Sequence, residues 1–174
     1  LRLGSFLFFR IKKDGEDKRF RSIKPSATQF FMTWTLQGLW VSMCSMCALT
    51  AIASESGIVI NAMFFIGAAL FISGLFLEVI ADRQKTEFRS IPENRDRYIT
   101  SGLWAKSRHP NFFGEVILWL GVAVISFSSL QGLQYITLIS PIFTYCLLVY
   151  VSGVRMLEAR ADKQWGNEEE YKKY

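Results

Sequence analysis

Lysine and arginine are missing from two long stretches of this 174-residue chain, residues 25–81 and residues 111–154. A membrane-spanning helix needs about 20 apolar residues, so each stretch has room for two such helices. Charged residues make up only 20% of the chain, against about 25% in soluble domains, and 51% of its residues are hydrophobic. These shortages argue against a disordered chain or a charged coiled coil and favour a multi-pass membrane protein.

Other absences exclude classes of site. The chain has one histidine and three cysteines, of which Cys44 and Cys47 form a C-x-x-C inside an apolar stretch with no second pair. These residues cannot build a zinc site, so no metal is expected. The G-x-G-x-x-G, Walker and G-x-S-x-G motifs are also missing, which argues against a Rossmann domain and a hydrolase nucleophile. The chain begins at Leu1 without a methionine, and we expect it to be N-terminally incomplete.

The predicted fold is all-α, a polytopic membrane bundle of about four transmembrane helices arranged as two antiparallel hairpins. The four spans are expected at about 27–53, 58–80, 111–129 and 133–156, within a single membrane domain over residues 1–174. Short polar turns, 54–57 and 128–132, close the hairpins, and a charged loop over 82–110 joins them. Pro110 suits the first turn of the third helix, and Pro141 is expected to kink the fourth.

The basic residues fall into three blocks that flank the apolar spans, at about 10–24, 83–108 and 155–173. In a four-span arrangement these blocks share one side of the membrane, which the positive-inside rule makes the cytosolic side. The net charge of +5 therefore indicates contact with membrane lipid and not with nucleic acid. We expect an integral membrane protein of the endoplasmic reticulum if the source is eukaryotic, and of the inner membrane otherwise.

The segment Ser101–Glu115 carries the densest group of polar residues with chemical potential. Arg108 and His109 precede the third span, where unpaired backbone N–H groups and a guanidinium favour phosphate or carboxylate. Asn111 can donate and accept hydrogen bonds, and Glu115, one turn deeper, needs a polar partner inside the membrane. His109 has three open roles, as a helix cap, a ligand contact or a catalytic base.

A repeated pattern, L-E-x-x-A-D-[RK]-Q, closes the second and fourth spans at 77–84 and 157–164. Each copy holds two acids four residues apart on one helix face: Glu78 with Asp82, and Glu158 with Asp162. The pattern predicts two polar walls around one cavity, with convergent helix-end composition as the alternative. Arg155, next to the second copy, is either a snorkelling anchor or a phosphate-binding arginine. Tyr98 and Trp104 are either interfacial aromatics or rings that stack on a flat ligand.

The stretches Leu77–Lys85 and Gly102–Glu115 resemble the DUF1295 family, which is related to the C-terminal domain of steroid 5-alpha-reductases. The wider superfamily includes sterol reductases and isoprenylcysteine carboxyl methyltransferases. The resemblance covers the chain and implies a polytopic reductase with NADPH in a cytosol-facing helical cavity. It implies cofactor contacts at Asp82, Arg89, Asn111, Glu115 and Arg155, with Glu78 near a position where the reductases carry asparagine. Arg108 and His109 belong to the family pattern, and a similar Arg-His-Pro stretch contacts S-adenosylmethionine in the methyltransferase branch.

Three functions stay open. The first is an NADPH-dependent oxidoreductase that reduces a conjugated C=C bond of a lipid or steroid-like enone, with Arg89, Arg108 and Arg155 near the phosphates. The second is an S-adenosylmethionine-dependent lipid methyltransferase, in which Glu158, or Glu115 with Arg108, binds the cofactor. The third is a non-catalytic membrane subunit of a larger complex that keeps the reductase fold. The sequence assigns no proton donor.

Overall fold

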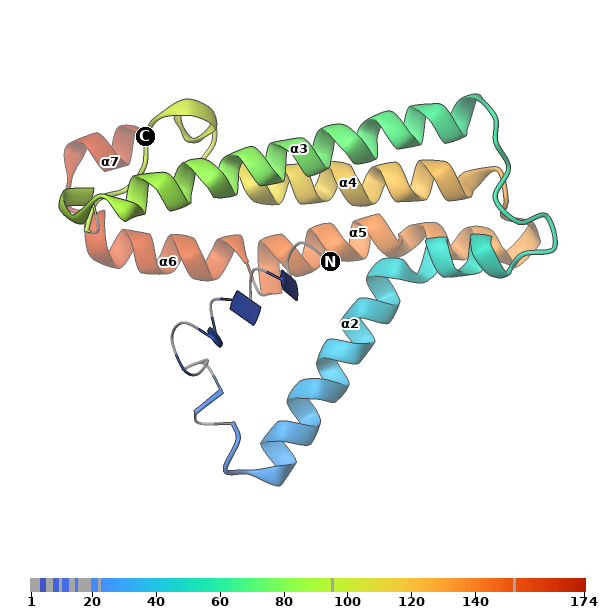
Figure 1. Cartoon of the computed structure of the whole chain (residues 1–174), viewed down its shortest axis with the longest axis horizontal. Helices are drawn as coiled ribbons and strands as arrows, with labels where there is room; N and C mark the ends of the chain where they lie inside the picture. Colours follow the sequence, from blue (N-terminus) through green and yellow to red (C-terminus); the bar gives the residue numbers. More distant parts are fainter. Residues whose placement is uncertain are drawn as a thin grey trace. The chain divides into compact units, whose positions relative to one another are not determined.

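A computed structural model describes residues 23–94, 96–151 and 153–174, and before residue 23 only residues 4, 5, 8, 9, 11, 12, 15, 20 and 21. Within these ranges the regular structure is helical and contains no strand (Figure 1). Four helical segments are long and apolar enough to cross a membrane: Ala27–Ala53, Ala62–Ser90, Pro110–Phe127 and Gly132–Trp165. The predicted all-α polytopic class is therefore confirmed, and the protein is an integral membrane protein.

The chain divides into two compact units, Leu1–Ser42 and Met43–Tyr174. Most of the first basic block, and with it the predicted cytosolic position of that block, lies outside the described residues. Helix α2 (Ala27–Ala53) begins after Ser26, whose hydroxyl accepts a hydrogen bond from the Gln29 amide at 3.3 Å. In the first unit, the Phe20 ring stacks on the Trp34 ring with the centroids 6.0 Å apart.

In the second unit, the two predicted hairpin turns bind each other. The Gln131 side-chain amide donates to the Ser56 hydroxyl at 2.9 Å, and the Val59 amide donates to the Ser129 hydroxyl at 3.2 Å. Asn61 caps helix α3 (Ala62–Ser90) by accepting from the Phe64 amide, and its own side-chain amide donates to the hydroxyl of Ser128 at 2.9 Å. Both turns therefore lie at the same end of this unit.

Helices α3 and α4 (Pro110–Phe127) run antiparallel and side by side along their length (Figure 1). Glycines seven residues apart on each helix meet in pairs, Gly67 with Gly121 and Gly74 with Gly114. A Cβ atom on Gly74 would lie 2.5 Å from the carbonyl oxygen of Gly114, so only glycine permits this backbone contact. Small residues of this kind are the usual basis of close helix packing in membranes. The outer faces carry exposed apolar side chains, Ile72 and Phe76 among them, which suit contact with lipid.

Helix α3 continues to Ser90, although the charged sequence predicted a loop from Asp82. The polar extension suits a helix outside the bilayer, because Arg83 pairs with Glu87 one turn later at 2.7 Å. The helix ends where Ile91 adopts an extended conformation, as residues before proline usually do. The loop between the hairpins is therefore shorter than expected and starts near Pro92.

The fourth span is not the single kinked helix that the sequence predicted over 133–156. It begins as a 3-10 helix (Gly132–Ile139), continues as α5 (Ser140–Cys146), widens into a π-helical turn (Leu147–Val151) and resumes as α6 (Val154–Trp165). Pro141 lies in the first turn of α5, where its missing N–H costs little. The break instead lies at the π-helical turn. Gly153 follows it, and a Cβ atom there would lie 2.1 Å from the carbonyl oxygen of Leu148.

The glycine contact between α3 and α4 predicts opposite effects for two Gly→Ala substitutions. G74A should lower the thermal unfolding temperature in detergent, because overpacking costs about 1–3 kcal/mol. G38A is the matched control, since Gly38 also lies in a helix and a Cβ atom there meets nothing within 4 Å. Alanine is favoured over glycine in helices by about 1 kcal/mol, so G38A should not destabilise. A G74A protein as stable as the parent would contradict the close contact.

Candidate functional site

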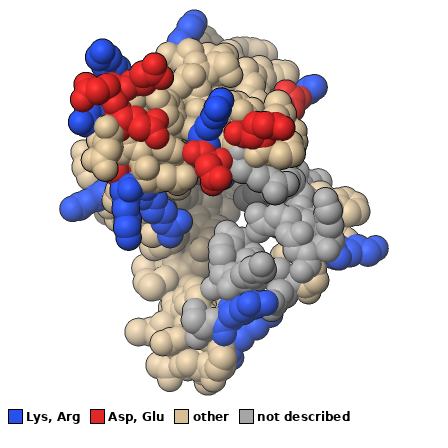
Figure 2. Space-filling view, turned by 90° about the vertical axis from the view of Figure 1, so that its left-hand side faces the viewer, with Lys and Arg blue, Asp and Glu red and all other residues tan. Residues whose placement is uncertain are grey.

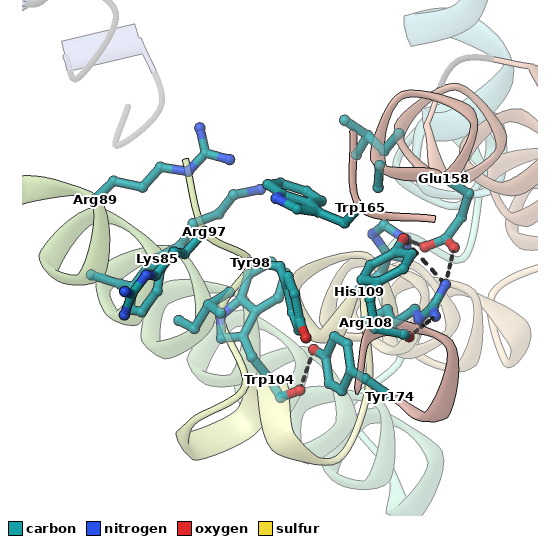
Figure 3. Close-up of a pocket in the computed structure, with 15 residues that line it drawn as sticks. Lys85, Arg89, Arg97, Tyr98, Trp104, Arg108, His109, Glu158, Trp165 and Tyr174 are labelled. Carbon is teal, nitrogen blue, oxygen red and sulfur yellow. Dashed lines mark hydrogen bonds and ion pairs between the residues drawn. The ribbon is translucent and has the colours of Figure 1, made fainter. Parts of the chain in front are cut away.

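A cavity of about 110 Å³ lies at the end of the second unit opposite the two hairpin turns (Figure 1), and Figure 3 draws the side chains that line it. Its walls come from the polar end of α3, the loop before α4, helix α6 and helix α7 (Glu169–Lys173) with the residue that follows it. Acidic and basic side chains intermix over this end (Figure 2). The lining residues are Lys85, Phe88, Arg89, Arg97, Tyr98, Ile99, Trp104, Arg108, His109, Leu157, Glu158, Ala161, Trp165, Tyr171 and Tyr174.

The floor of this pocket forms where the loop before α4 docks on α3. Trp104 is 4% exposed and packs on Ala81, and its indole N–H donates to the Ala81 carbonyl oxygen at 3.0 Å. Gln84, one turn later, accepts from the Leu103 amide at 3.0 Å and covers Gly102, whose positive φ of +62° favours glycine. The small and polar residues at the end of α3 thus fix the course of the loop that carries Arg108 and His109.

Arg108, His109 and Glu158 form one wall of the pocket. The Arg108 Nη1 atom donates to Oε2 of Glu158 at 2.5 Å, and Nε2 of His109 lies 2.5 Å from Oε1 of the same carboxylate. These side chains are 28%, 18% and 28% exposed respectively, so the contacts are partly shielded from water. Because Glu158 lies on α6 and the other two precede α4, the carboxylate joins the end of the fourth span to the start of the third.

Arg108 also holds the C-terminal segment. Its Nη2 atom donates to the Tyr171 carbonyl oxygen at 3.0 Å, and its guanidinium lies 4.5 Å from the centre of the Tyr171 ring. Burial opposes the charge on Arg108, but the hydrogen bond and charge of Glu158 leave the pKa of the guanidinium raised. Burial raises the pKa of Tyr171, so the phenol stays protonated at neutral pH. The Tyr174 hydroxyl donates to the Trp104 carbonyl oxygen at 2.5 Å.

Aromatic rings line the pocket next to this wall. The Tyr98 ring lies 5.6 Å from Trp165, 5.1 Å from Tyr171 and 5.7 Å from Tyr174, measured between centroids. The Lys85 ammonium lies 4.9 Å from the centre of the Trp104 ring. Arg89 and Arg97 are exposed at the rim beside these rings. The pocket therefore combines flat apolar surfaces with three cations besides Arg108, a combination suited to a ligand with a planar ring and phosphate.

The structure divides the residues predicted as a site. Four of them line the pocket: Arg89, Arg108, His109 and Glu158. Four others form a second group between α3 and α4, deeper in the unit: Glu78, Asp82, Asn111 and Glu115. Arg155 is exposed and lines neither group. The predicted pair of acidic walls is thus realised only in part, since Glu158 lines the pocket whereas Glu78 and Asp82 do not.

In the second group, the Asn111 side-chain amide lies 3.4 Å from Oδ1 of Asp82, at the long limit of a hydrogen bond. Glu115 lies within electrostatic range of Glu78 and Asp82. The Oδ1 atom of Asn111 is buried and has no hydrogen-bond partner among the described residues. Because an unsatisfied buried acceptor is costly, this atom marks a place that a ligand donor or a water molecule could satisfy.

The pocket residues that sequence reasoning missed include Lys85, Arg97, Trp165, Tyr171 and Tyr174. A usable signal was present, because aromatic residues recur in polar segments at 98–104 and 165–174, outside the apolar spans. Large aromatic rings in such polar segments are expected to pack against one another or against a ligand. His109 takes the N-cap position of α4 but makes no side-chain capping bond, since its ring binds Glu158 instead.

The fold and the pocket define a multi-pass helical membrane protein with a polar and aromatic cavity at one end. The chain belongs to the DUF1295 family, described as a protein family of unknown function, whose profile matches residues 1–174. This confirms the resemblance seen in the sequence.

Curated relatives of two kinds are similar to the chain. It is 40% identical over 67 residues to steroid 5-alpha-reductase DET2 of Arabidopsis thaliana, covering 37% of this chain and 25% of that protein. It is 28% identical over 113 residues to 3-oxo-5-alpha-steroid 4-dehydrogenase 1 of Bos taurus, covering 64% and 39%. It is 28% identical over 92 residues to the probable O-methyltransferase ustE of Ustilaginoidea virens, covering 51% and 32%. The chain thus spans well under half the length of these relatives, and no solved structure matches it significantly.

Proposed function

We propose that this chain is the cofactor-binding part of a membrane-embedded, NADPH-dependent reductase that acts on the conjugated C=C bond of a lipid or steroid-like enone. The names of two relatives support a steroid-reductase-like activity. The observation that carries the proposal is the pocket itself, in which Lys85, Arg89 and Arg97 surround the rings of Tyr98 and Trp104. Cations of this kind attract phosphate, and aromatic rings stack on adenine or nicotinamide.

The residues present fit a dinucleotide in chemistry and in part in size. Pockets that enclose drug-sized ligands measure roughly 300–1,000 Å³, so the cavity of about 110 Å³ holds one ring or one phosphate group. An open groove that shares Phe88, Arg97, Tyr98 and Trp165 with the cavity extends this surface. Outside this cavity, in the deeper group between α3 and α4, the buried Asn111 Oδ1 atom offers a further acceptor to a hydroxyl or amide donor. NADPH, when bound, supplies the hydride, and the chain's part is to bind, orient and shield it.

S-adenosylmethionine is the alternative cofactor. The relative named as a probable O-methyltransferase favours it, and so does the Glu158 carboxylate in the pocket wall, which can accept from ribose hydroxyls. The two cofactors differ in charge, because NADPH carries several phosphate negatives whereas S-adenosylmethionine carries a sulfonium cation. Removing a cation from the pocket should therefore weaken the binding of NADPH but not that of S-adenosylmethionine.

Binding to the purified protein separates the two candidates. Under the reductase proposal NADPH raises the unfolding temperature and S-adenosylmethionine does not, since a ligand that binds the folded state stabilises it. R89A should weaken NADPH binding about tenfold, because a charge-assisted hydrogen bond contributes about 1.5–3 kcal/mol. R160A is the matched control, as Arg160 is an exposed arginine of α6 outside the pocket. Stabilisation by S-adenosylmethionine alone would contradict the reductase proposal and indicate a methyltransferase. Stabilisation by neither ligand would favour a non-catalytic subunit.

We also propose that the pocket faces the cytosol, in the endoplasmic reticulum if the source is eukaryotic and in the inner membrane otherwise. The proposal follows from the basic blocks at 83–108 and 155–173, which lie at the pocket end, whereas the two turns at the other end carry no lysine or arginine.

Cysteine labelling in sealed vesicles tests this orientation. Single cysteines at Ser56 or Gln131, in a background without the exposed Cys146, should react with an impermeant maleimide only from the side opposite the cytosol. A cysteine at the exposed Lys106, next to the pocket loop, is the matched control and should react only from the cytosolic side. Labelling of a cysteine at position 56 or 131 from the cytosolic side would contradict the proposed orientation.

A further inference from the structure

The contact of Glu158 with two donors fixes where protons lie in the pocket wall. An ionised carboxylate only accepts hydrogen bonds, and a guanidinium only donates them. Each oxygen of Glu158 has one partner here, Oε2 facing Arg108 and Oε1 facing Nε2 of His109. The His109 ring must therefore carry its proton on Nε2, because a bare nitrogen lone pair at that position would face a carboxylate oxygen.

The other ring nitrogen, Nδ1, is left as an acceptor whenever the imidazole is neutral. His109 lines the pocket, and in the described part of the chain no hydrogen bond reaches Nδ1. Arg108 is already engaged by Glu158 and by the Tyr171 carbonyl oxygen. This wall therefore offers a ligand an acceptor, whereas Lys85, Arg89 and Arg97 offer positive charge elsewhere in the pocket.

We infer that Glu158 is a positioning residue that holds His109 with Nδ1 as a hydrogen-bond acceptor, so that this wall recognises a hydroxyl or amide N–H of the ligand and not its phosphate. The identity of the ligand as NADPH rests on the proposed function, but the state of His109 does not. For His109, which the sequence left as a cap, a ligand contact or a base, this inference selects the ligand contact. The phosphate of the ligand meets Arg89 and Arg97 at the rim, and a sugar hydroxyl or carboxamide group meets His109.

An isosteric substitution, E158Q, tests the first half of this inference without any ligand. The new amide must point its oxygen at Arg108, which can only donate, and its NH₂ group at His109. Nε2 of His109 must then accept, so the ring proton moves to Nδ1. Because His109 is the only histidine, ¹⁵N NMR of histidine-labelled protein reports this ring alone.

In the parent protein, at a pH where the ring is neutral, the Nε2–H tautomer should dominate, and in E158Q the Nδ1–H tautomer should. E87Q is the matched control, since Glu87 also pairs with an arginine, Arg83, but on the exposed face of α3 outside the pocket. It should leave the histidine spectrum unchanged. A dominant Nδ1–H tautomer in the parent would overturn the inference even if E158Q fails to fold, and so would an E158Q spectrum identical to that of the parent.

NADPH binding tests the second half. E158Q should weaken NADPH binding about three- to tenfold, the equivalent of one neutral hydrogen bond. Loss of a negative charge alone would strengthen the binding of an anion, so weaker binding points to the tautomer. In an H109A background E158Q should cause no further loss, because the residue acts through His109. Unchanged or tighter binding by E158Q would overturn the recognition of a ligand donor. If the parent does not bind NADPH, the proposed function fails, and the NMR result still decides the role of Glu158.

Discussion

The backbone contact between α3 and α4 is the constraint on which the second unit depends. Gly67 and Gly74 leave no room for a Cβ atom against Gly121 and Gly114, so the two helices are locked in register as well as in distance. In a bilayer, where burial of apolar surface gives helices little reason to associate, this close packing supplies the attraction. The register then decides which residues of α3 lie beside the beginning of α4.

That register builds the pocket. Beyond Gly74, one heptad further along α3, Ala81 is small enough to receive the Trp104 indole, and Gln84 fixes the next turn of the loop. The loop then delivers Arg108 and His109 to the position where α6 presents Glu158. The π-helical turn before Gly153 separates the membrane part of the fourth span from α6. The carboxylate on α6 therefore belongs to the polar end of the unit.

The sequence predicted what depends on local composition. Two stretches without lysine or arginine indicated four spans, and Pro110 marked the start of α4. It did not predict that α3 continues to Ser90, because the charged composition was interpreted as a loop, although the Arg83 and Glu87 pair, four residues apart, is a local helix signal. Nor could it predict the pairing of Arg108 with Glu158, fifty positions apart in sequence. Arg155 and Glu158 lie within one turn of each other on α6, yet only Glu158 faces the pocket, since helix rotation is set by packing.

The central proposal is that the polar and aromatic end of the second unit is a nucleotide site. Photoaffinity labelling with an azido-adenine derivative of NADP⁺, followed by peptide mapping, tests this most directly. We expect the label to attach to peptides from the pocket walls, over residues 97–109 or 157–174, and unmodified NADPH to compete with this labelling. Labelling confined to the hairpin turns at 54–61 and 128–132, or labelling that NADPH does not reduce, would contradict it.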